Sequence, residues 1–400
     1  MTAYTIITAD SHAGGSHADY RAYLDPAYLD DFDAWRGRYK NPFKDLKDDR
    51  RTRNWDSDQR WREQEADGVV AEVVFPNTVP PFFPSFVLFA GPPKPEDYAH
   101  RLAGIRAHNR WLVDFVAQCP ERRAGIGQIF LNDVDDALAD AQWIIDHDLR
   151  GGVLLPNVGP EIGYVKPLYD PGYDPLWKLL EDNEVPVNIH GGTGVPDYGP
   201  YPFSMLLYIN EAAFFSQRPL THLILGGVLE RFPKLKLVIT ETGCHWVPGL
   251  LDRMDKVIRQ IRDTGATGEI RYREGNKLRQ DATDYFRQNV WMGVSQPGPS
   301  DAAVIDVIGR DRFMWGNDYP HDEGTFPFTR EHLRQVFPGV GEGDMRKILA
   351  ENAASLYRFD LAKLAPLAEA HGPTVAELAE PLTELPEHPN DALLRGLQPA

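Results

Sequence analysis

Ionisable side chains recur at the ends of short apolar segments in this 400-residue chain. Asp10 and His12 close the segment YTIITADSH, His190 closes VPVNIH, Glu241 closes LKLVITE and Asp318 closes RFMWGND. A random distribution of polar residues would not place them so regularly at one end of otherwise apolar runs. We therefore expect these side chains to meet at one site.

The residue types at this site predict a metal centre. Asp10 and His12 are two residues apart, so an extended chain points both side chains to the same side. With His190 and Asp318 they make a mixed nitrogen and oxygen set that suits Zn²⁺, Mn²⁺ or Fe²⁺ and leaves a position open for water. A divalent ion there would activate that water, with Asp318 as ligand or general base. His321, three residues further on, would position Asp318 or contact substrate.

Glu241 and His245 raise the alternative of a second metal ion. They are four residues apart, so an immediate helix after Glu241 would place them on one face, about 5–6 Å apart. They would then ligate a second ion or form an acid/base pair, and the whole set would resemble a nonheme di-iron or dimanganese centre. Alternatively, His245 caps a helix or lines the pocket, and Glu241 orients His190. One ion is our main expectation and two remain open.

The elements that must position these residues alternate between strand and helix. Eight short, nearly continuous apolar runs are typical of parallel strands buried on both faces. They are residues 4–10, 69–75, 124–131, 151–156, 185–190, 235–241, 289–294 and 312–318. Longer segments with helical spacing separate them. Eight such units predict an α/β fold, the TIM (β/α)8 barrel, whose catalytic groups sit at the carboxyl ends of the strands. An open doubly wound sheet would need a glycine-rich phosphate loop, which ADSHAGGSH does not supply.

Long loops between strands and the following helices should lie over the mouth of the barrel. They are residues 13–60, 75–93 and 191–205. Prolines stiffen the second loop, so Phe82, Phe83 and Phe86 would form an apolar wall for a ring-bearing substrate, or else a dimer contact. Tyr198, just beyond His190, adds to the apolar pocket. We expect a small apolar organic substrate and a homodimer.

Composition excludes some partners. There are 42 Lys and Arg against 59 Asp and Glu, a net charge of −17, which argues against nucleic acid or an anionic membrane. No basic segment followed by an apolar one begins the chain, and no apolar run approaches membrane-spanning length. The two cysteines suit a reducing compartment. We expect a cytoplasmic protein.

Several longer motifs together resemble a known family. They are the ADSH start, HNRWLVDF (108–115), PERRAGIGQIFLNDVDDA (120–137), GGVLLP (151–156), PLYDPGYDPLW (167–177), VNIHGG (188–193), ERFPKLKLVITETG (230–243), WGNDYPHDEG (315–324) and ENAASLYRFD (351–360). The chain resembles the amidohydrolase superfamily, in the amidohydrolase-related branch that also holds decarboxylases like aminocarboxymuconate-semialdehyde decarboxylase. The resemblance implies a distorted barrel over residues 1–360, with a C-terminal tail over 361–400. It also implies a metal bound through His12, His190, Asp318 and residue 10.

Three positions depart from the family pattern. Asp10 stands where many members carry the first histidine of His-x-His, which gives a more anionic site. The segment GGVLLPNVG offers no lysine for the carbamate that bridges two metals in binuclear members. Glu241 stands where decarboxylase-like members carry a histidine, so the proton donor of those enzymes is missing.

These observations lead to a main hypothesis and its rivals. The main one is a metal-dependent hydrolase that uses a metal-activated water on an apolar, ring-bearing substrate. A variant of it decarboxylates the substrate or cleaves another C–C bond. The alternative from another reaction class is a nonheme di-iron monooxygenase in which Glu241 and His245 hold the second ion. A barrel that retains ligands only as a binding protein is the rival outside enzymes.

Overall fold

Eight parallel strands form the centre of the molecule in the computed structural model, which describes residues 2–39, 52–85, 90–156 and 162–396. Their order around the sheet is β1-β2-β3-β4-β5-β6-β9-β10. The strands are β1 (Ile7–Ala13), β2 (Ala71–Pro76), β3 (Arg123–Gln128), β4 (Gly152–Leu154), β5 (Pro186–His190), β6 (Lys236–Thr240), β9 (Val290–Ser295) and β10 (Phe313–Gly316). Each lies within two or three residues of its predicted range.

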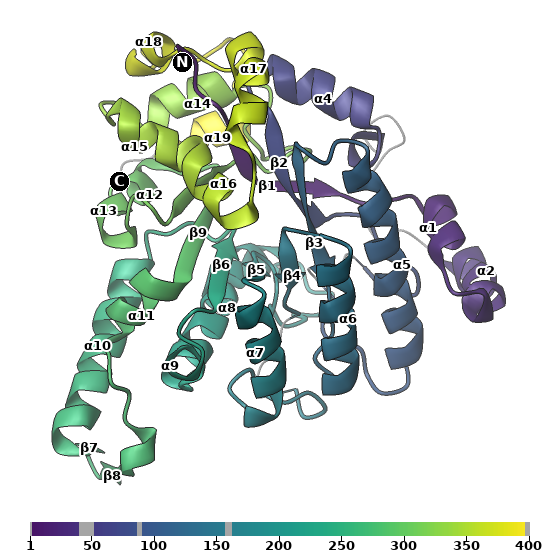
Figure 1. The fold of residues 1–400 in the computed structure, drawn as a ribbon, viewed down its shortest axis with the longest axis vertical. Coiled ribbons are helices and arrows are strands. Elements are labelled where there is room, and N and C mark those ends of the chain that lie inside the picture. Colours follow the sequence, from purple (N-terminus) through teal and green to yellow (C-terminus); the bar gives the residue numbers. More distant parts are fainter. Residues whose placement is uncertain (1, 40–51, 86–89, 157–161, 397–400) are drawn as a thin grey trace.

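The sheet curves until its last strand meets its first. The amide of Asp318, just after β10, donates to the carbonyl of Asp10 in β1 at 3.0 Å, and the amide of His12 donates to Tyr319 at 2.7 Å. Helices cover the outside of the strands (Figure 1). This architecture confirms the predicted TIM (β/α)8 barrel.

The helices fall where helical spacing places them, with additional short ones. They are α1 (His17–Tyr23), α2 (Leu29–Arg38), α4 (Ser57–Ala66), α5 (Tyr98–Ala117), α6 (Val134–Asp146), α7 (Asp174–Asp182), α8 (Ser204–Leu225), α9 (Val228–Arg231), α10 (Val247–Thr264), α11 (Ala282–Asn289), α12 (Pro299–Ala302), α13 (Ile305–Ile308), α14 (Thr329–Val336), α15 (Glu342–Arg346), α16 (Asn352–Tyr357), α17 (Leu361–His371), α18 (Val375–Ala379) and α19 (Asp391–Arg395). A small hairpin of β7 (Ala266–Thr267) and β8 (Ile270–Arg271) follows α10. None of the described helices is long and apolar enough to cross a membrane.

The chain after residue 360 packs back onto the barrel. Ala3 pairs with Thr374 in an isolated antiparallel bridge, and Arg330 of α14 forms an ion pair with Glu377 of α18. The Asn390 amide donates to the carbonyls of Gly324, Thr325 and Phe326. The tail therefore holds the loop that follows β10. A boundary between barrel and tail at residue 360 remains a prediction.

A buried carboxylate links the end of α4 to the start of α14. Asp67 accepts a hydrogen bond from the backbone amide of Thr329 at 3.0 Å, while its second oxygen is buried with no hydrogen-bond partner among the described residues. Burial raises the pKa of Asp67 to about 7, although the contacts with Thr329 oppose the shift. The folded state therefore prefers the protonated form of this residue.

This preference predicts a pH-dependent loss of stability that Asp67→Asn should remove. The folded pKa of about 7 lies above the ordinary value of about 3.9, so the contribution is complete below pH 4 and lost as pH rises through 7. Between pH 5 and pH 8 the native chain should lose about 3 kcal/mol of unfolding free energy relative to the variant. Urea unfolding at both values measures this. The matched control Asp135→Asn, at an exposed position, should follow the native chain. Parallel curves for all three proteins would contradict the assignment.

Candidate metal centre

The predicted site residues converge at the carboxyl ends of the strands. Asp10 and His12 lie on one side of β1, and His190 is the last residue of β5. Glu241 follows β6 directly, and Asp318 lies two residues beyond β10. The barrel thus brings together residues that are up to 308 positions apart in the sequence, from Asp10 to Asp318. The structure therefore brings these five side chains close together.

The backbone at three strand ends adopts a conformation that residues other than glycine rarely take. Glu241, Gln296 and Asp318 have φ angles of 58°, 42° and 59°, in the left-handed region. Each such residue costs on the order of 1 kcal/mol unless its surroundings hold it in place. All three directly follow or closely follow strands of the barrel. Strained backbone concentrated around one cluster of polar side chains is typical of a functional site.

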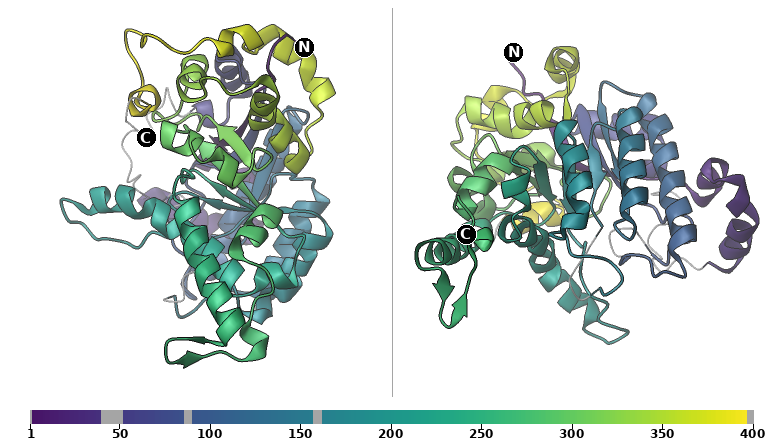
Figure 2. Two further views of the ribbon diagram at one scale, coloured as in Figure 1. Left: turned by 90° about the vertical axis from the view of Figure 1, so that its left-hand side faces the viewer. Right: turned by 60° about the horizontal axis from the view of Figure 1, so that its bottom comes forward.

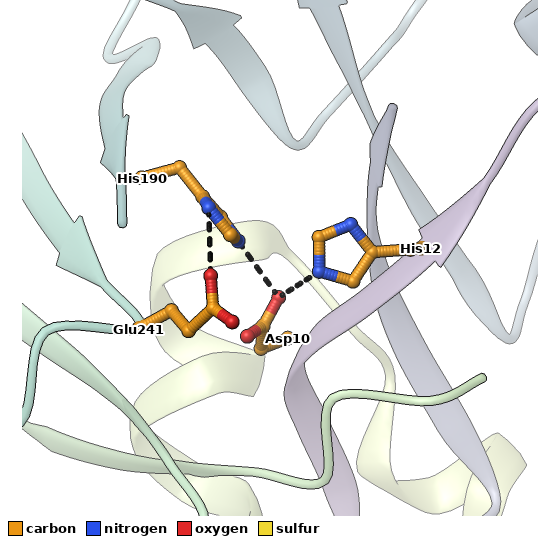
Figure 3. Close-up of side chains that lie close together, drawn as sticks. All are labelled: Asp10, His12, His190 and Glu241. Carbon is orange, nitrogen blue, oxygen red and sulfur yellow. Dashed lines mark hydrogen bonds and ion pairs between the residues drawn. The ribbon is translucent and has the colours of Figure 1, made fainter. Parts of the chain in front are cut away.

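Four side chains form the centre of the cluster (Figure 3). One oxygen of Asp10 lies 3.3 Å from Nε2 of His12 and 3.4 Å from Nε2 of His190. On its other side the His190 ring places Nδ1 3.1 Å from Glu241. One possible ligand atom from each of the four lies within 4.8 Å of every other. Ser295 donates to the second oxygen of Asp10 and fixes that carboxylate.

Asp318 and His321 extend the cluster on the side of β10. An oxygen of Asp318 lies 3.2 Å from Nε2 of His12 and 2.7 Å from Nδ1 of His321. Gln296 donates to the other oxygen of Asp318. The second nitrogen of His321 faces the amide oxygen of Asn77 at 3.0 Å. Since both ring nitrogens of His321 have oxygen partners, both carry protons in this arrangement.

The charges at the site stabilise one another. Burial alone raises the pKa of Asp10, but the imidazoles of His12 and His190 outweigh it and hold that pKa well below its usual range. Burial also raises the pKa of Asp318, and His321 with His12 reverses the shift. Burial lowers the pKa of His321, but Asp318 more than compensates, so this pKa rises to about 10.

Glu241 behaves differently from the other two carboxylates. Burial and then the negative charge of Asp318 raise its pKa, and the imidazole of His190 only partly offsets them. Solvent reaches 27% of the Glu241 side-chain surface, whereas the side chains of Asp10 and Asp318 are fully buried. Glu241 therefore lies at the opening of the site and favours the protonated state more than its neighbours do.

The residues at this site fit a divalent metal ion. Nε2 of His12 is buried and makes no hydrogen bond to any described residue, although two carboxylates face it. Nδ1 of His190 lies 3.0 Å from the carbonyl of Gly191, and its Nε2 faces Asp10. Buried imidazole nitrogens beside carboxylates are the ligands that Zn²⁺ and Mn²⁺ take once the nitrogens give up their protons.

A buried ion network behind β1 holds this strand in place. Glu72 of β2 pairs with Arg60 of α4 and with Arg123 of β3, and it accepts a hydrogen bond from Ser11 at 3.0 Å. Arg60 also donates to the carbonyl of His12 at 2.8 Å. The side of β1 that faces away from the cluster is thereby fixed, and with it the directions of Asp10 and His12.

His245 lies apart from the cluster. The condition for placing Glu241 and His245 on one helical face is not met, because α10 begins only at Val247. The carboxylate of Asp301 accepts hydrogen bonds from the backbone amides of Cys244 and His245, and this holds the segment in an irregular turn. The His245 side chain is 60% exposed, with Nδ1 3.5 Å from Asp301. The second-metal hypothesis therefore loses one of its two ligands.

The aromatic residues predicted to contact substrate lie in several places. Phe83 is fully buried in a small apolar cluster with Phe130 and carries Arg101 over its ring, so it packs rather than presents a surface. Phe82 contacts Trp35 of α2. Phe86 is outside the described residues. The Tyr198 hydroxyl donates to Glu211 of α8.

Sequence reasoning missed the residues that hold the ligands. Ser295 ends β9 and Gln296 directly follows it, and Asn77 directly follows β2; no metal ligand was predicted at the end of either strand. Their position at strand ends was a signal that the sequence offered, but the search for site residues relied on ionisable side chains and these three are neutral. Glu72 stands out as an acid inside an apolar strand, which could have marked a buried ion pair.

Comparison with known proteins decides the family. The amidohydrolase family model matches residues 18–359. The chain belongs to this family. The match confirms the resemblance drawn from the motifs, and it makes the chain an enzyme of the amidohydrolase superfamily.

Solved structures confirm the fold. An amidohydrolase from Mycobacterium avium subsp. paratuberculosis K-10 has a TM-score of 0.65 at 20% identity, covering 88% of this chain and 98% of that one. The 5-carboxyvanillate decarboxylase of Sphingomonas paucimobilis has a TM-score of 0.64 at 21% identity, covering 89% and 100%. A dihydroxybenzoic acid decarboxylase of Polaromonas sp. JS666, with bound manganese and the inhibitor 2-nitroresorcinol, has a TM-score of 0.59 at 16% identity, covering 89% and 97%.

The donor set predicts which histidines bind metal. His12→Ala and His190→Ala should each weaken Mn²⁺ binding by more than about 100-fold, since each removes a buried nitrogen of the cluster. His245→Ala is the matched control and should bind like the native chain. Calorimetric titration of metal-free protein measures all four. Equal loss in the His245→Ala protein, or none in the other two, would show that the ligands are assigned wrongly.

Proposed function

We propose that this enzyme is a metal-dependent decarboxylase of a small aromatic carboxylic acid. The observation that carries the proposal is the buried pair of Asp318 and His321, which holds a proton beside the metal ligands. The decarboxylases among the similar structures act on aromatic acids, as 5-carboxyvanillate and 2,6-dihydroxybenzoate show. Hydrolysis, the main hypothesis from the sequence, becomes the second candidate.

Loss of carbon dioxide from an aromatic acid needs one proton at the ring carbon. The C–C bond to the carboxylate breaks, its electron pair stays on the ring carbon, and that carbon takes the proton. In our proposal the proton comes from His321, whose Nδ1 is held 2.7 Å from an oxygen of Asp318. The His321 side chain is 26% exposed, so solvent can return the proton after each turnover.

Asp10, His12, His190 and Asp318 would hold the metal ion, here manganese or zinc, and Glu241 would orient His190. Bound there, a divalent ion supplies positive charge and Lewis acidity for a carboxylate or phenolate oxygen of the substrate. Ser295 donates a hydrogen bond to Asp10 and Gln296 donates one to Asp318, so these two side chains keep the ligand carboxylates in fixed directions. Asn77 holds the His321 ring so that its proton faces Asp318.

A cavity of about 430 Å³ between α1, α2 and the segment after β2 is large enough for a single ring. Phe32, Tyr39 and Trp55 are among its lining residues, together with Asn54. Asn54 accepts a hydrogen bond of 2.6 Å from Asn77, which in turn contacts His321. This chain of contacts connects the cavity to the proton donor.

Because both cysteines are free, we also propose that the enzyme works in the reducing cytoplasm.

Hydrolysis would use residues of the same site, but it would begin with removal of a proton from water rather than delivery of a proton to the substrate. Asp318 would take a proton from water, and Glu241 at the opening could give one to the leaving group, since its pKa is raised. The absence of a histidine at position 241 favours this candidate. The di-iron monooxygenase is not proposed, because it depended on His245 as a ligand and this residue lies beside Asp301 instead.

Isotopes distinguish decarboxylation from hydrolysis. In deuterated water with Mn²⁺, carboxyl-labelled hydroxybenzoates should release labelled carbon dioxide and gain one deuterium on the ring carbon. His321→Asn should lower kcat by about 100-fold or more while Mn²⁺ binding persists, and the control His245→Ala should keep full activity. Gas analysis and mass spectrometry measure the two products.

Two other results would overturn the proposal. Cleavage of aryl esters or amides with ¹⁸O taken from water, and no carbon dioxide from any acid, would establish hydrolysis. Full decarboxylation by the His321→Asn protein would remove this residue from the proton path.

A further inference from the structure

The N-terminal half of α8 exposes an unusual amount of apolar surface. Six side chains there have 46–71% of their surface exposed. We call these residues the α8 patch: Phe203, Met205, Leu206, Leu207, Ile209 and Phe214. Tyr201, just before the helix, is also exposed. Folded monomers rarely expose contiguous apolar patches of this kind without a use for them.

The two halves of α8 have different surroundings. Toward its C-terminal end Leu220, Leu223 and Ile224 are fully buried against the barrel, and Ser216 hydrogen-bonds the carbonyl of His190 at 3.4 Å. The N-terminal half and the loop before it project away from the barrel in both views of Figure 2. The patch is therefore carried on a helix that is firmly anchored at one end.

The polar residues of the projecting half do not interrupt the patch. Residues 201–216 contain one charged side chain, Glu211, whose carboxylate accepts a hydrogen bond from Tyr198. Phe203, Leu207 and Phe214 fall on one face of the helix, and Leu206, Ile209 and Met205 follow in that order around the helix away from that face. An apolar surface over most of the free circumference is typical of a helix that is buried in the working molecule.

We propose that the α8 patch is covered by the α8 patch of a second copy of this chain, forming a symmetric dimer. With Tyr201, the exposed apolar surface amounts to roughly 800 Å² per chain, which is what each partner contributes to a stable interface of standard size. A twofold dimer places the same patch on both sides, so one apolar, nearly uncharged surface is sufficient.

Charge argues for a second copy over a membrane. Amphipathic helices that bind membranes carry Lys and Arg on their polar face, and residues 201–216 have none. The whole chain has a net charge of −17, so anionic lipid would repel it. Two copies would repel each other elsewhere for the same reason, and the neutral α8 patch is where that repulsion is weakest.

The interface would lie near the opening of the active site. His190 ends the strand that leads through residues 191–203 into α8. Tyr208, on the inner side of the projecting half, has its pKa raised by burial and by the carboxylate of Glu241. A partner bound to the outer side of α8 would therefore fix the position of a helix that forms one wall of that opening.

The oligomeric state of designed variants tests the proposal. The native chain at about 20 μM should sediment with twice the mass of one chain, and Leu206→Glu/Ile209→Glu should sediment as a monomer, because four carboxylates would face one another in the interface. The matched control Ile270→Glu/Leu394→Glu adds the same charge at apolar positions that are 61% and 46% exposed outside the patch. It should remain a dimer. Circular dichroism and thermal unfolding verify that both variants fold.

The other outcomes decide against the proposal. A monomeric native chain would overturn it, whether the patch then serves another protein or stays uncovered. A dimer that survives Leu206→Glu/Ile209→Glu would place the interface elsewhere. If the patch variant fails to fold, the single change Leu207→Glu is compared with Leu394→Glu, since both positions are 46% exposed. These results do not depend on which reaction the enzyme catalyses.

Discussion

The exclusion of water from a cluster of three carboxylates is the constraint on which this structure depends. Asp10 and Asp318 have no exposed side-chain surface and Glu241 has little. Several buried negative charges at this distance are very unfavourable unless positive charge offsets them. Protonated His321 supplies part of it from the segment after β10. A divalent cation bound by His12, His190 and the carboxylates would supply the remainder, so the residues whose burial is unfavourable are also those that suit a metal ion.

The surroundings are built to hold this cluster in one arrangement. Left-handed backbone at Glu241, Gln296 and Asp318 turns the chain sharply where each strand ends. Such a backbone persists only when neighbouring residues hold it in place. The buried ion pairs of Glu72 with Arg60 and Arg123 hold a different part of the site, the strand β1 that carries Asp10 and His12. They fix β1 from behind, and the tail fixes the loop after β10 from outside.

Sequence alone predicted the parts that depend on local pattern. Eight apolar runs located the strands, and polar residues at their ends located the cluster, since a barrel brings those ends together. It failed where distant residues decide the local structure. His245 is held out of the site by Asp301 from a later element, and Phe83 is buried by residues of α5 and the loop after β3. Neither contact leaves a periodic signal in the sequence.

The exchange of histidine for Glu241 illustrates how the charge of the site sets its chemistry. With histidine at that position, as in the decarboxylase-like members this chain resembles, an imidazole would face His190. Glu241 instead adds a carboxylate near Asp318, and the negative charge of Asp318 contributes to the raised pKa of Glu241. His321 is then the imidazole with an oxygen partner for a proton on each nitrogen. In the proposed decarboxylation the proton donor would therefore follow β10 rather than β6. Part of the net charge of −17 counted from the sequence thus lies inside the barrel, where His321 and a bound cation would balance it.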